Sequence, residues 1–246
     1  MVIGDGGSVT SDLSAATNAA GNLVLNGGIL LYTGATASTD RNFTLNAGTT
    51  STISVSTGAN TLTMSGSTTA TTGSLTKAGA GTLLLSGTNL HTGVTTLTAG
   101  SLSVAAIGDG GSVASNLSAA TNAAGNLVFN GGTLLYTGAT AATDRNFTLN
   151  AATTGTINVS VGANTLTMSG SSAATTGNLT KAGAGILLLT GTNVHTGVTS
   201  INAGTLSVGA IGNGGDATGN LSAATNAAAN LVLGGGTLLY TGATVT

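Results

Sequence analysis

One segment of this chain returns at a constant spacing of 104 residues (3 to 107 and 107 to 211). The string IGDGGSV at positions 3–9 recurs at 107–113, and a looser copy begins at Ile211. Units with such a constant period cannot close a core alone and must stack on their neighbours. We therefore predict a solenoid that forms a single continuous domain over residues 1–246. Its sequence repeats are 3–106, 107–210 and a partial 211–246.

The composition excludes an ordinary globular surface. Charged residues make up 4% of the chain, proline and cysteine are absent, and Gly, Thr, Ser, Ala and Asn fill most of the space between short apolar pairs. Disordered chains combine low hydrophobicity with high net charge, whereas here 41% of the residues are hydrophobic and the formal net charge is −2. The chain is therefore expected to bury apolar side chains at regular intervals.

Apolar and polar residues alternate in short runs, which is the pattern of β-strands. Thr, Ser, Asn and Gly have weak helix propensity, and the runs have apolar residues two positions apart and mostly end at Gly or Asn. Such runs occupy 22–26, 43–45, 53–55, 62–64, 83–85 and 102–104. We predict an all-β protein whose strands turn one face inward and whose glycines lie at the corners.

Strands this short and this closely spaced favour a parallel β-helix. With a coil of about 20 residues, each repeat makes about five coils. Each strand then bonds to the coils before and after it, inward apolar residues stack as ladders, and outward Thr and Asn form ladders of like residues. Stacked like charges would repel, so the fold explains the scarcity of charge without a membrane.

Two stretches of the chain share a longer motif. From Leu75 the sequence runs LTKAGAGTLLLSGTNLHTGVTTLTAGSLSV, and from Leu179 it runs LTKAGAGILLLTGTNVHTGVTSINAGTLSV. This pattern resembles the autotransporter-associated β-strand repeat, or passenger-associated transport repeat, of bacterial surface passenger domains. The matching positions, which we take as structural residues, are Leu75, Lys77, Gly79, Gly81, Leu83, Leu85, Gly87, Asn89 and Gly93, and Leu179, Lys181, Gly183, Gly185, Leu187, Leu189, Gly191, Asn193 and Gly197.

The resemblance implies a right-handed parallel β-helix, exported and then carried across the outer membrane by a C-terminal β-barrel. It implies a location outside the cell or at the bacterial outer-membrane surface. The intervening stretch from Asn22, NLVLNGGILLYTGATASTDRNFTL, also looks like the segments between these motifs in large passengers. The sequence departs from the family at His91 and His195, where the family usually has tyrosine.

Both ends of the sequence lie inside the repeat pattern. Met1 and Val2 directly precede the first copy, and Thr246 falls within the third. We expect a fragment of a longer array, so a missing signal peptide is uninformative about export. The ends of a solenoid are unpaired strand edges, which favour association with further copies end to end.

The ionisable residues do not predict an enzyme, and we expect no catalytic residue and no cofactor. Glycoside hydrolysis needs two carboxyl groups a few ångströms apart, whereas the acids here recur mostly singly, one period apart. His91 and His195 are also one period apart and lack a second ligand at metal spacing, so we assign them a structural role at a turn. Asp40-Arg41 and Asp144-Arg145 are interpreted as loop charge pairs, or as pairs that close the turn before Phe43 and Phe147, with a ligand contact as the alternative.

Other ligand classes find little support. The string GDGG at 4–7 and 108–111 hints at calcium β-rolls, but one Asp per repeat cannot supply six oxygen ligands, and we predict no metal site. The same string lacks the lysine of a phosphate loop. Four cations against six acids leave no basic stripe for nucleic acid, and no run is long enough to span a membrane as a helix.

Three functions remain. The first is a non-catalytic stalk or display scaffold of an adhesin-like passenger, with host-cell, glycan or matrix surfaces as its contacts. The second is a self-assembling extracellular filament or sheath. The third is an ice-binding solenoid, suggested by Thr61-x-Thr63 and Thr165-x-Thr167, although such a face would need Thr-x-Thr in every coil.

Overall fold

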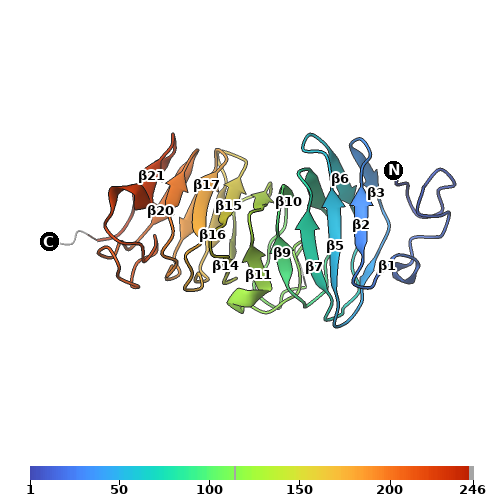
Figure 1. Ribbon diagram of the computed structural model, residues 1–246, viewed down its shortest axis with the longest axis horizontal. Helices are drawn as coiled ribbons and strands as arrows, with labels where there is room; N and C mark the ends of the chain where they lie inside the picture. The colour runs from blue at the N-terminus through green and yellow to red at the C-terminus, as the bar shows by residue number, and fades with distance from the viewer. Residues whose placement is uncertain (114, 244–246) are drawn as a thin grey trace. The chain divides into compact units, whose positions relative to one another are not determined.

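The computed structural model describes residues 1–113 and 115–243. They form two units, Met1–Thr121 and Asn122–Thr246. In each unit every described strand pairing is parallel, and each unit is a β-solenoid of stacked coils (Figure 1). The all-β parallel β-helix predicted above is confirmed. Its right-handedness stays a prediction.

The described residues of the first unit form ten short strands and one 3₁₀ helix. They are η1 (Ala20–Asn22), β1 (Val24–Leu25), β2 (Ile29–Tyr32), β3 (Ala37–Thr39), β4 (Thr44–Leu45), β5 (Thr50–Val55), β6 (Thr61–Met64), β7 (Ser74–Ala78), β8 (Thr82–Leu85), β9 (Thr95–Leu97) and β10 (Ser101–Val104). In this unit the sheet orders are β2-β5-β7-β9, β3-β6-β8-β10 and β1-β4. Strands β2, β5, β7 and β9 lie side by side in Figure 1.

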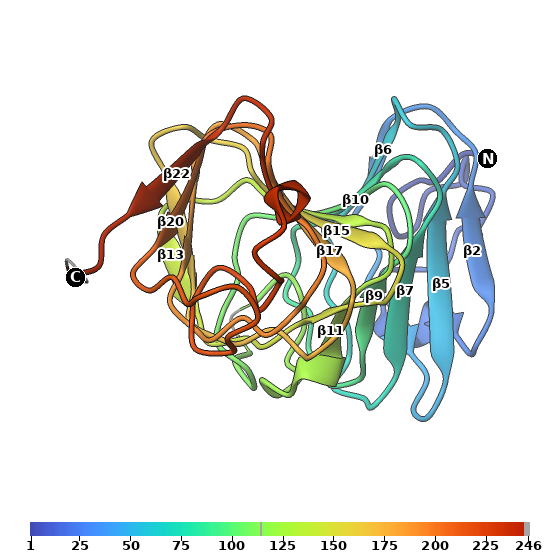
Figure 2. The same cartoon turned by 60° about the vertical axis from the view of Figure 1, so that its left-hand side comes forward.

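The second unit repeats this plan. Its elements are η2 (Ala124–Asn126), β11 (Leu127–Phe129), β12 (Thr133–Tyr136), β13 (Ala141–Thr143), β14 (Thr148–Leu149), β15 (Thr154–Val159), β16 (Thr165–Met168), β17 (Asn178–Ala182), β18 (Ile186–Leu189), β19 (Thr199–Ile201), β20 (Thr205–Val208), η3 (Ala228–Asn230), β21 (Leu231–Leu233) and β22 (Thr237–Tyr240). The orders are β12-β15-β17-β19-β21, β13-β16-β18-β20-β22 and β11-β14. Figure 2 shows β13, β20 and β22 on one side of this unit.

Alternating burial along most strands produces the predicted inward and outward ladders. In β6, β8 and β10 the inward residues Leu62, Leu83 and Leu102 stack in register and are 0% exposed. The outward residues of β5, β7 and β9 include a column of threonines at 52, 76 and 96. The predicted outward ladder of like residues is confirmed here, because the register places hydroxyl side chains directly above one another.

The predicted count of about five coils per 104 residues is wrong. In the second unit, four successive pairings lead from Thr133 through Thr156, Thr180 and Ser200 to Val232, 99 residues further along the chain (133 to 232). The last of these coils is long, because Thr199 pairs with Leu231 across the loop that carries η3. The prediction assumed that all coils have the same length, and a long loop such as this one lowers the number of coils per repeat.

Glycines allow neighbouring coils to approach closely at the corners. Gly79 has a φ of +72°, and a Cβ atom there would overlap the carbonyl oxygen of Val55 in the preceding coil. The equivalent Gly183 has a φ of +73° and faces Val159 in the same way. A side chain at either position would force the two coils apart and strain the backbone.

Candidate functional site

The repeat motif places a lysine inside the solenoid. Lys77 lies between Ile53 and Leu97 in an inward ladder of the first unit, and Lys181 lies between Ile157 and Ile201 in the second. Both lysines are 0% exposed. An unpaired buried charge is strongly unfavourable, so each ammonium group requires polar partners.

Backbone carbonyl groups at the corner satisfy each ammonium group. Lys77 Nζ donates to the carbonyl oxygens of Ala78 at 2.6 Å, Gly79 at 2.9 Å and Ala99 at 3.0 Å. Ala78 and Gly79 belong to one corner, whereas Ala99 belongs to the corner of the next coil. Because an ammonium group has three N–H donors, the lysine is saturated and joins the corners of two coils.

The second lysine makes the same contacts. Lys181 Nζ donates to the carbonyls of Ala182 at 2.6 Å, Gly183 at 2.7 Å and Ala203 at 3.2 Å. Burial lowers the pKa of both Lys77 and Lys181 to about 8, so both are mostly protonated at pH 7. With all donors bound and no solvent exposure, this lysine acts as a clamp between coils and not as a nucleophile.

Asn89 and His91 of the motif hold the loop that follows it. The Asn89 backbone N–H donates to the Ser115 carbonyl at 3.0 Å, and its side-chain amide donates to the Asn116 carbonyl. The carbonyl of His91 accepts from the Ala119 N–H at 2.9 Å. The motif corner therefore anchors the loop that begins the next sequence repeat.

The second copy of the motif repeats this anchor. The backbone N–H of Asn193 donates to the Gly219 carbonyl at 3.0 Å, its side chain donates to the Asn220 carbonyl, and Ala223 N–H donates to the His195 carbonyl at 2.9 Å. The loop after β20 is thus attached on one side by the same two motif residues.

The imidazole of His195 is enclosed between two hydroxyl groups. Nδ1 lies 3.3 Å from Ser172 Oγ, and Nε2 lies 3.2 Å from Thr199 Oγ1. The ring is 0% exposed, and burial lowers its pKa to about 4. His91 is equally buried, with Nε2 at 3.2 Å from Thr95 Oγ1. Both histidines lie inside the coil stack, whereas the sequence predicts a position at a turn.

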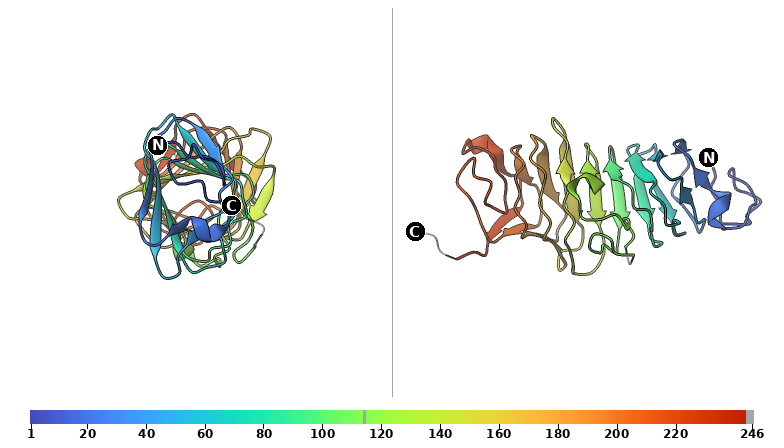
Figure 3. Two further views of the ribbon diagram at one scale, coloured as in Figure 1. Left: turned by 90° about the vertical axis from the view of Figure 1, so that its right-hand side faces the viewer. Right: turned by 90° about the horizontal axis from the view of Figure 1, so that it is seen from below.

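The remaining motif positions divide into core and corner residues. All motif leucines are 0% exposed: Leu75, Leu83, Leu85, Leu179, Leu187 and Leu189. A Cβ atom at the other glycines would overlap the backbone of the preceding coil: Gly81, Gly87, Gly93, Gly185, Gly191 and Gly197. Figure 3 shows the stacked coils of each unit. The motif therefore specifies how one coil fits the next.

Arg41 contacts a loop that is distant in sequence. Its side chain is 2% exposed, and its guanidinium group donates to four carbonyl oxygens of the loop 3–18. Nε donates to Gly4 at 3.0 Å, Nη1 to Ala16 at 3.1 Å, and Nη2 to Asp5 at 3.2 Å and to Ser14. No local pattern marks Arg41 as the partner of a loop so far away in sequence.

Asp40, next to Arg41, forms further hydrogen bonds with the same loop, one of them to Asp5. The Asp40 carboxylate accepts from Gly6 N–H at 2.7 Å and from the Asn18 side chain at 3.5 Å, and Asp5 accepts from Asp40 N–H at 3.0 Å. Asp40-Arg41 therefore closes a distant loop rather than its own turn. The GDGG string at 4–7 is part of this loop. Within residues 1–113 and 115–243, His, Cys, Asp and Glu nowhere form a group of three that could hold a metal.

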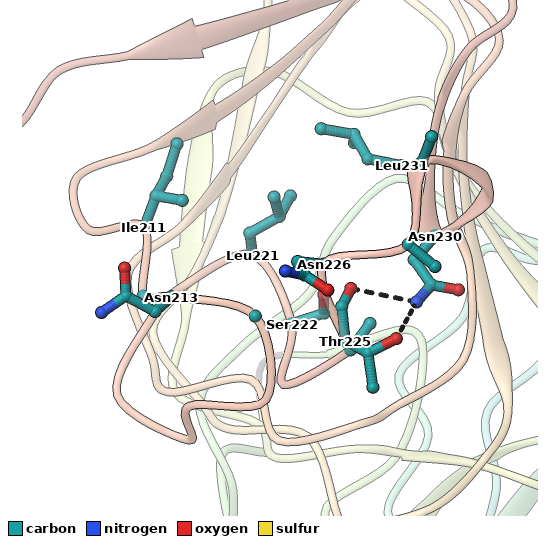
Figure 4. A pocket seen from close by; sticks show the side chains of 13 residues that line it. Ile211, Asn213, Leu221, Ser222, Thr225, Asn226, Asn230 and Leu231 are labelled. Carbon is teal, nitrogen blue, oxygen red and sulfur yellow. Dashed lines mark hydrogen bonds between the residues drawn. The ribbon is translucent and has the colours of Figure 1, made fainter.

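One pocket of about 360 Å³ lies in the second unit, at the loop between β20 and β21. Figure 4 shows Ile211, Asn213, Leu221 and Asn226 around it, with the side chain of Asn230 bonded to Thr225. The residues that line it are apolar, amide or hydroxyl residues, and none of them carries a charge. Of the helices in the described part of the chain, none has the length and apolarity to cross a membrane.

Comparisons with known proteins agree with this geometry. The passenger-associated transport repeat model matches residues 75–104 and 179–208, which contain both lysine clamps. The chain is 40% identical over 237 residues to the adhesin BmaC autotransporter of Brucella suis biovar 1 (strain 1330), which covers 96% of this chain and 7% of that protein. No solved structure matches. The two matched stretches are thus passenger-associated transport repeats, and the comparisons support an autotransporter passenger sequence built from such repeats.

Proposed function

We propose that this chain is a non-catalytic structural part of a surface-exposed, adhesin-like passenger, in which it serves as a stalk or display scaffold. The observation that carries the proposal is the internal use of its cations. Lys77, Lys181 and Arg41 are buried and bind backbone carbonyls. The chain has four cationic side chains in all and buries every one of them, so its positive charge serves the stacking of coils and not a surface site.

The relative supports the adhesive context. That protein is named an autotransporter adhesin, and the chain spans 7% of its length. We infer that the passenger containing this chain lies outside the cell or at the outer-membrane surface and contacts host cells, glycans or matrix. A repeated coil stack of this kind extends a contact away from the membrane and presents it in several copies.

A display experiment separates scaffold from adhesive contact. One, two or three copies of residues 3–106 are placed between a surface-anchored barrel and a short epitope tag, and antibody access is measured on cells with a thick polysaccharide coat. A stalk predicts that access rises with copy number. Equal access for all lengths contradicts the stalk.

The same display cells test direct adhesion by the repeats. Untagged arrays are compared with arrays carrying Leu83→Asp in binding to host cells and matrix proteins. A scaffold predicts equal, low binding by both arrays. Saturable binding by the native array alone would show that this segment itself makes the adhesive contact.

Filament assembly is a second candidate, favoured by the near-identical repeats and the low charge of the chain. Uncharged strand edges can pair with other chains. A filament predicts fibres in electron micrographs and concentration-dependent sedimentation. A monomer at all concentrations rules it out.

Ice binding finds less support in the ladders. The in-register neighbours of Thr63 are Ser38 and Leu84. A leucine in the column interrupts the hydroxyl array that such a face would need. Thermal hysteresis measured on the purified chain tests this alternative, and we expect none.

A further inference from the structure

The loops 3–18 and 211–226 are two copies of one structure. Gly7 N–H donates to the Ala16 carbonyl at 2.7 Å, and Gly215 N–H donates to the Ala224 carbonyl at 2.8 Å. In both loops the side-chain amide of a following asparagine, Asn22 or Asn230, binds the threonine five positions earlier. The two loops therefore present the same backbone carbonyls.

The two loops differ in what fills them. In the first, the guanidinium group of Arg41 lies among the carbonyls of residues 4, 5, 14 and 16, and Asp40 binds Gly6 and Asn18. In the second, the equivalent residues Gly212, Ser222, Ala224 and Asn226 line the pocket of about 360 Å³ (Figure 4). The pocket thus occupies the place that Arg41 and Asp40 take in the first loop.

Exposure of the lining supports this equivalence. Ile3 is 4% exposed beside the filled loop, whereas the matching Ile211 is 47% exposed beside the pocket. Asn213 replaces Asp5, but its side-chain oxygen can still accept the N–H bond that Asp5 accepts from Asp40. The acceptors for an Asp-Arg pair are therefore all present in the second loop.

We propose that this pocket is a receptor for the arginine of a Thr-Asp-Arg segment that stands where residues 39–41 stand in the first repeat. The guanidinium group binds the carbonyls of Gly212, Asn213, Ser222 and Ala224, and the aspartate accepts from Gly214 N–H and Asn226. The occupant is the segment that this chain itself carries at 39–41 and 143–145. The loop that opens each repeat is then sealed by an arginine of the same repeat, as Arg41 seals the loop 3–18.

The chemistry favours arginine over lysine. Four carbonyls around a planar group match the five donors of a guanidinium, whereas an ammonium has three donors on a compact centre. Hydrogen bonds to a charged group are among the stronger ones in proteins. The inference concerns the stacking of repeats and does not depend on adhesion.

The test appends the octapeptide Thr-Asp-Arg-Asn-Phe-Thr-Leu-Asn, copied from 143–150, directly after Thr246 of the full chain. This places the arginine at the position in the repeat that Arg41 and Arg145 occupy. Matched controls carry lysine or alanine in place of that arginine. Hydrogen exchange of residues 211–231 is measured in all three chains, together with the ¹⁵Nε–H signal of the appended arginine.

We expect exchange in 211–231 to slow at least about tenfold in the arginine chain and little in the two controls, since guanidinium hydrogen bonds of this kind are strong. The appended arginine should show a protected Nε–H signal. Equal exchange in all three chains, or an arginine signal in fast exchange with water, overturns the proposal. Slowing that is equal for arginine, lysine and alanine would assign the effect to the appended backbone and also overturn it.

Discussion

Two inward ladders of the first unit solve the packing of coils differently. One ladder, in β6, β8 and β10, is wholly apolar at Leu62, Leu83 and Leu102. The other, in β5, β7 and β9, has Lys77 between Ile53 and Leu97. The first needs only burial of apolar area, whereas the second ends at corners whose carbonyls need donors. The solenoid thus combines a uniform core with a charged clamp at one corner of the repeat.

The largest effect is expected in the apolar ladder. Leu83→Asp places a carboxylate among leucines without a partner, which should cost more than about 4 kcal/mol and unfold the coils around β8. Hydrogen exchange across β6, β8 and β10 measures the loss.

The matched control for that change is Leu84→Asp, one position along on the outward face, where the side chain is half-buried. Its effect should be much smaller. Similar unfolding by both substitutions would mean that the two faces of β8 are not distinct.

The lysine clamp should give the next largest effect. Lys77→Met keeps an unbranched side chain in the ladder but leaves the carbonyls of Ala78, Gly79 and Ala99 without their donor, so we expect a loss of about 3 kcal/mol. Urea titration followed by hydrogen exchange in β7 measures it. Lys181→Met should cause the same loss in β17, and an unchanged midpoint for both variants would refute the clamp.

Acid should weaken the coil around His195. Because burial lowers the pKa of this group from 6.5 to about 4, the unfolded chain binds a proton between these values and the folded chain does not. Stability is therefore complete above pH 6.5 and falls as the pH decreases to 4, by about 2–3 kcal/mol.

The readout for this pH dependence is hydrogen exchange in β19 at pH 7, 5.5 and 4. His195→Tyr removes the titrating group and should flatten the dependence by that amount. If the variant keeps the full pH dependence of the native chain, His195 is not its source.

The smallest effect is expected on the outward face. Thr76→Ala removes one member of the threonine column between Thr52 and Thr96, and we expect a change within about 0.5 kcal/mol. Thermal unfolding measures it beside Lys77→Met, one residue further along. A loss as large as that of the lysine variant would place much of the stacking energy in the outward ladder.

The period-two pattern predicted which leucines face inward, because alternation fixes the side of a strand directly. The same parity puts Lys77 on the side of Leu75, so the buried lysine was within reach of sequence reasoning. What it binds was not, since carbonyls at a corner carry no sequence signal. The predicted number of coils was wrong for a similar reason. A long loop precedes β21, so β21 pairs with a strand, β19, that is far away in sequence. Arg41 reaches a loop through tertiary structure alone.

The central claim is that the repeat motif places its lysine inside the solenoid as a clamp. The chain has two lysines, Lys77 and Lys181, so ¹⁵N NMR of their ammonium groups at pH 6 gives an unambiguous readout. The account predicts two protected ammonium signals in slow exchange with water, with hydrogen-bond couplings to carbonyl carbons. Two signals in fast exchange, as for lysines in free solution, would contradict it.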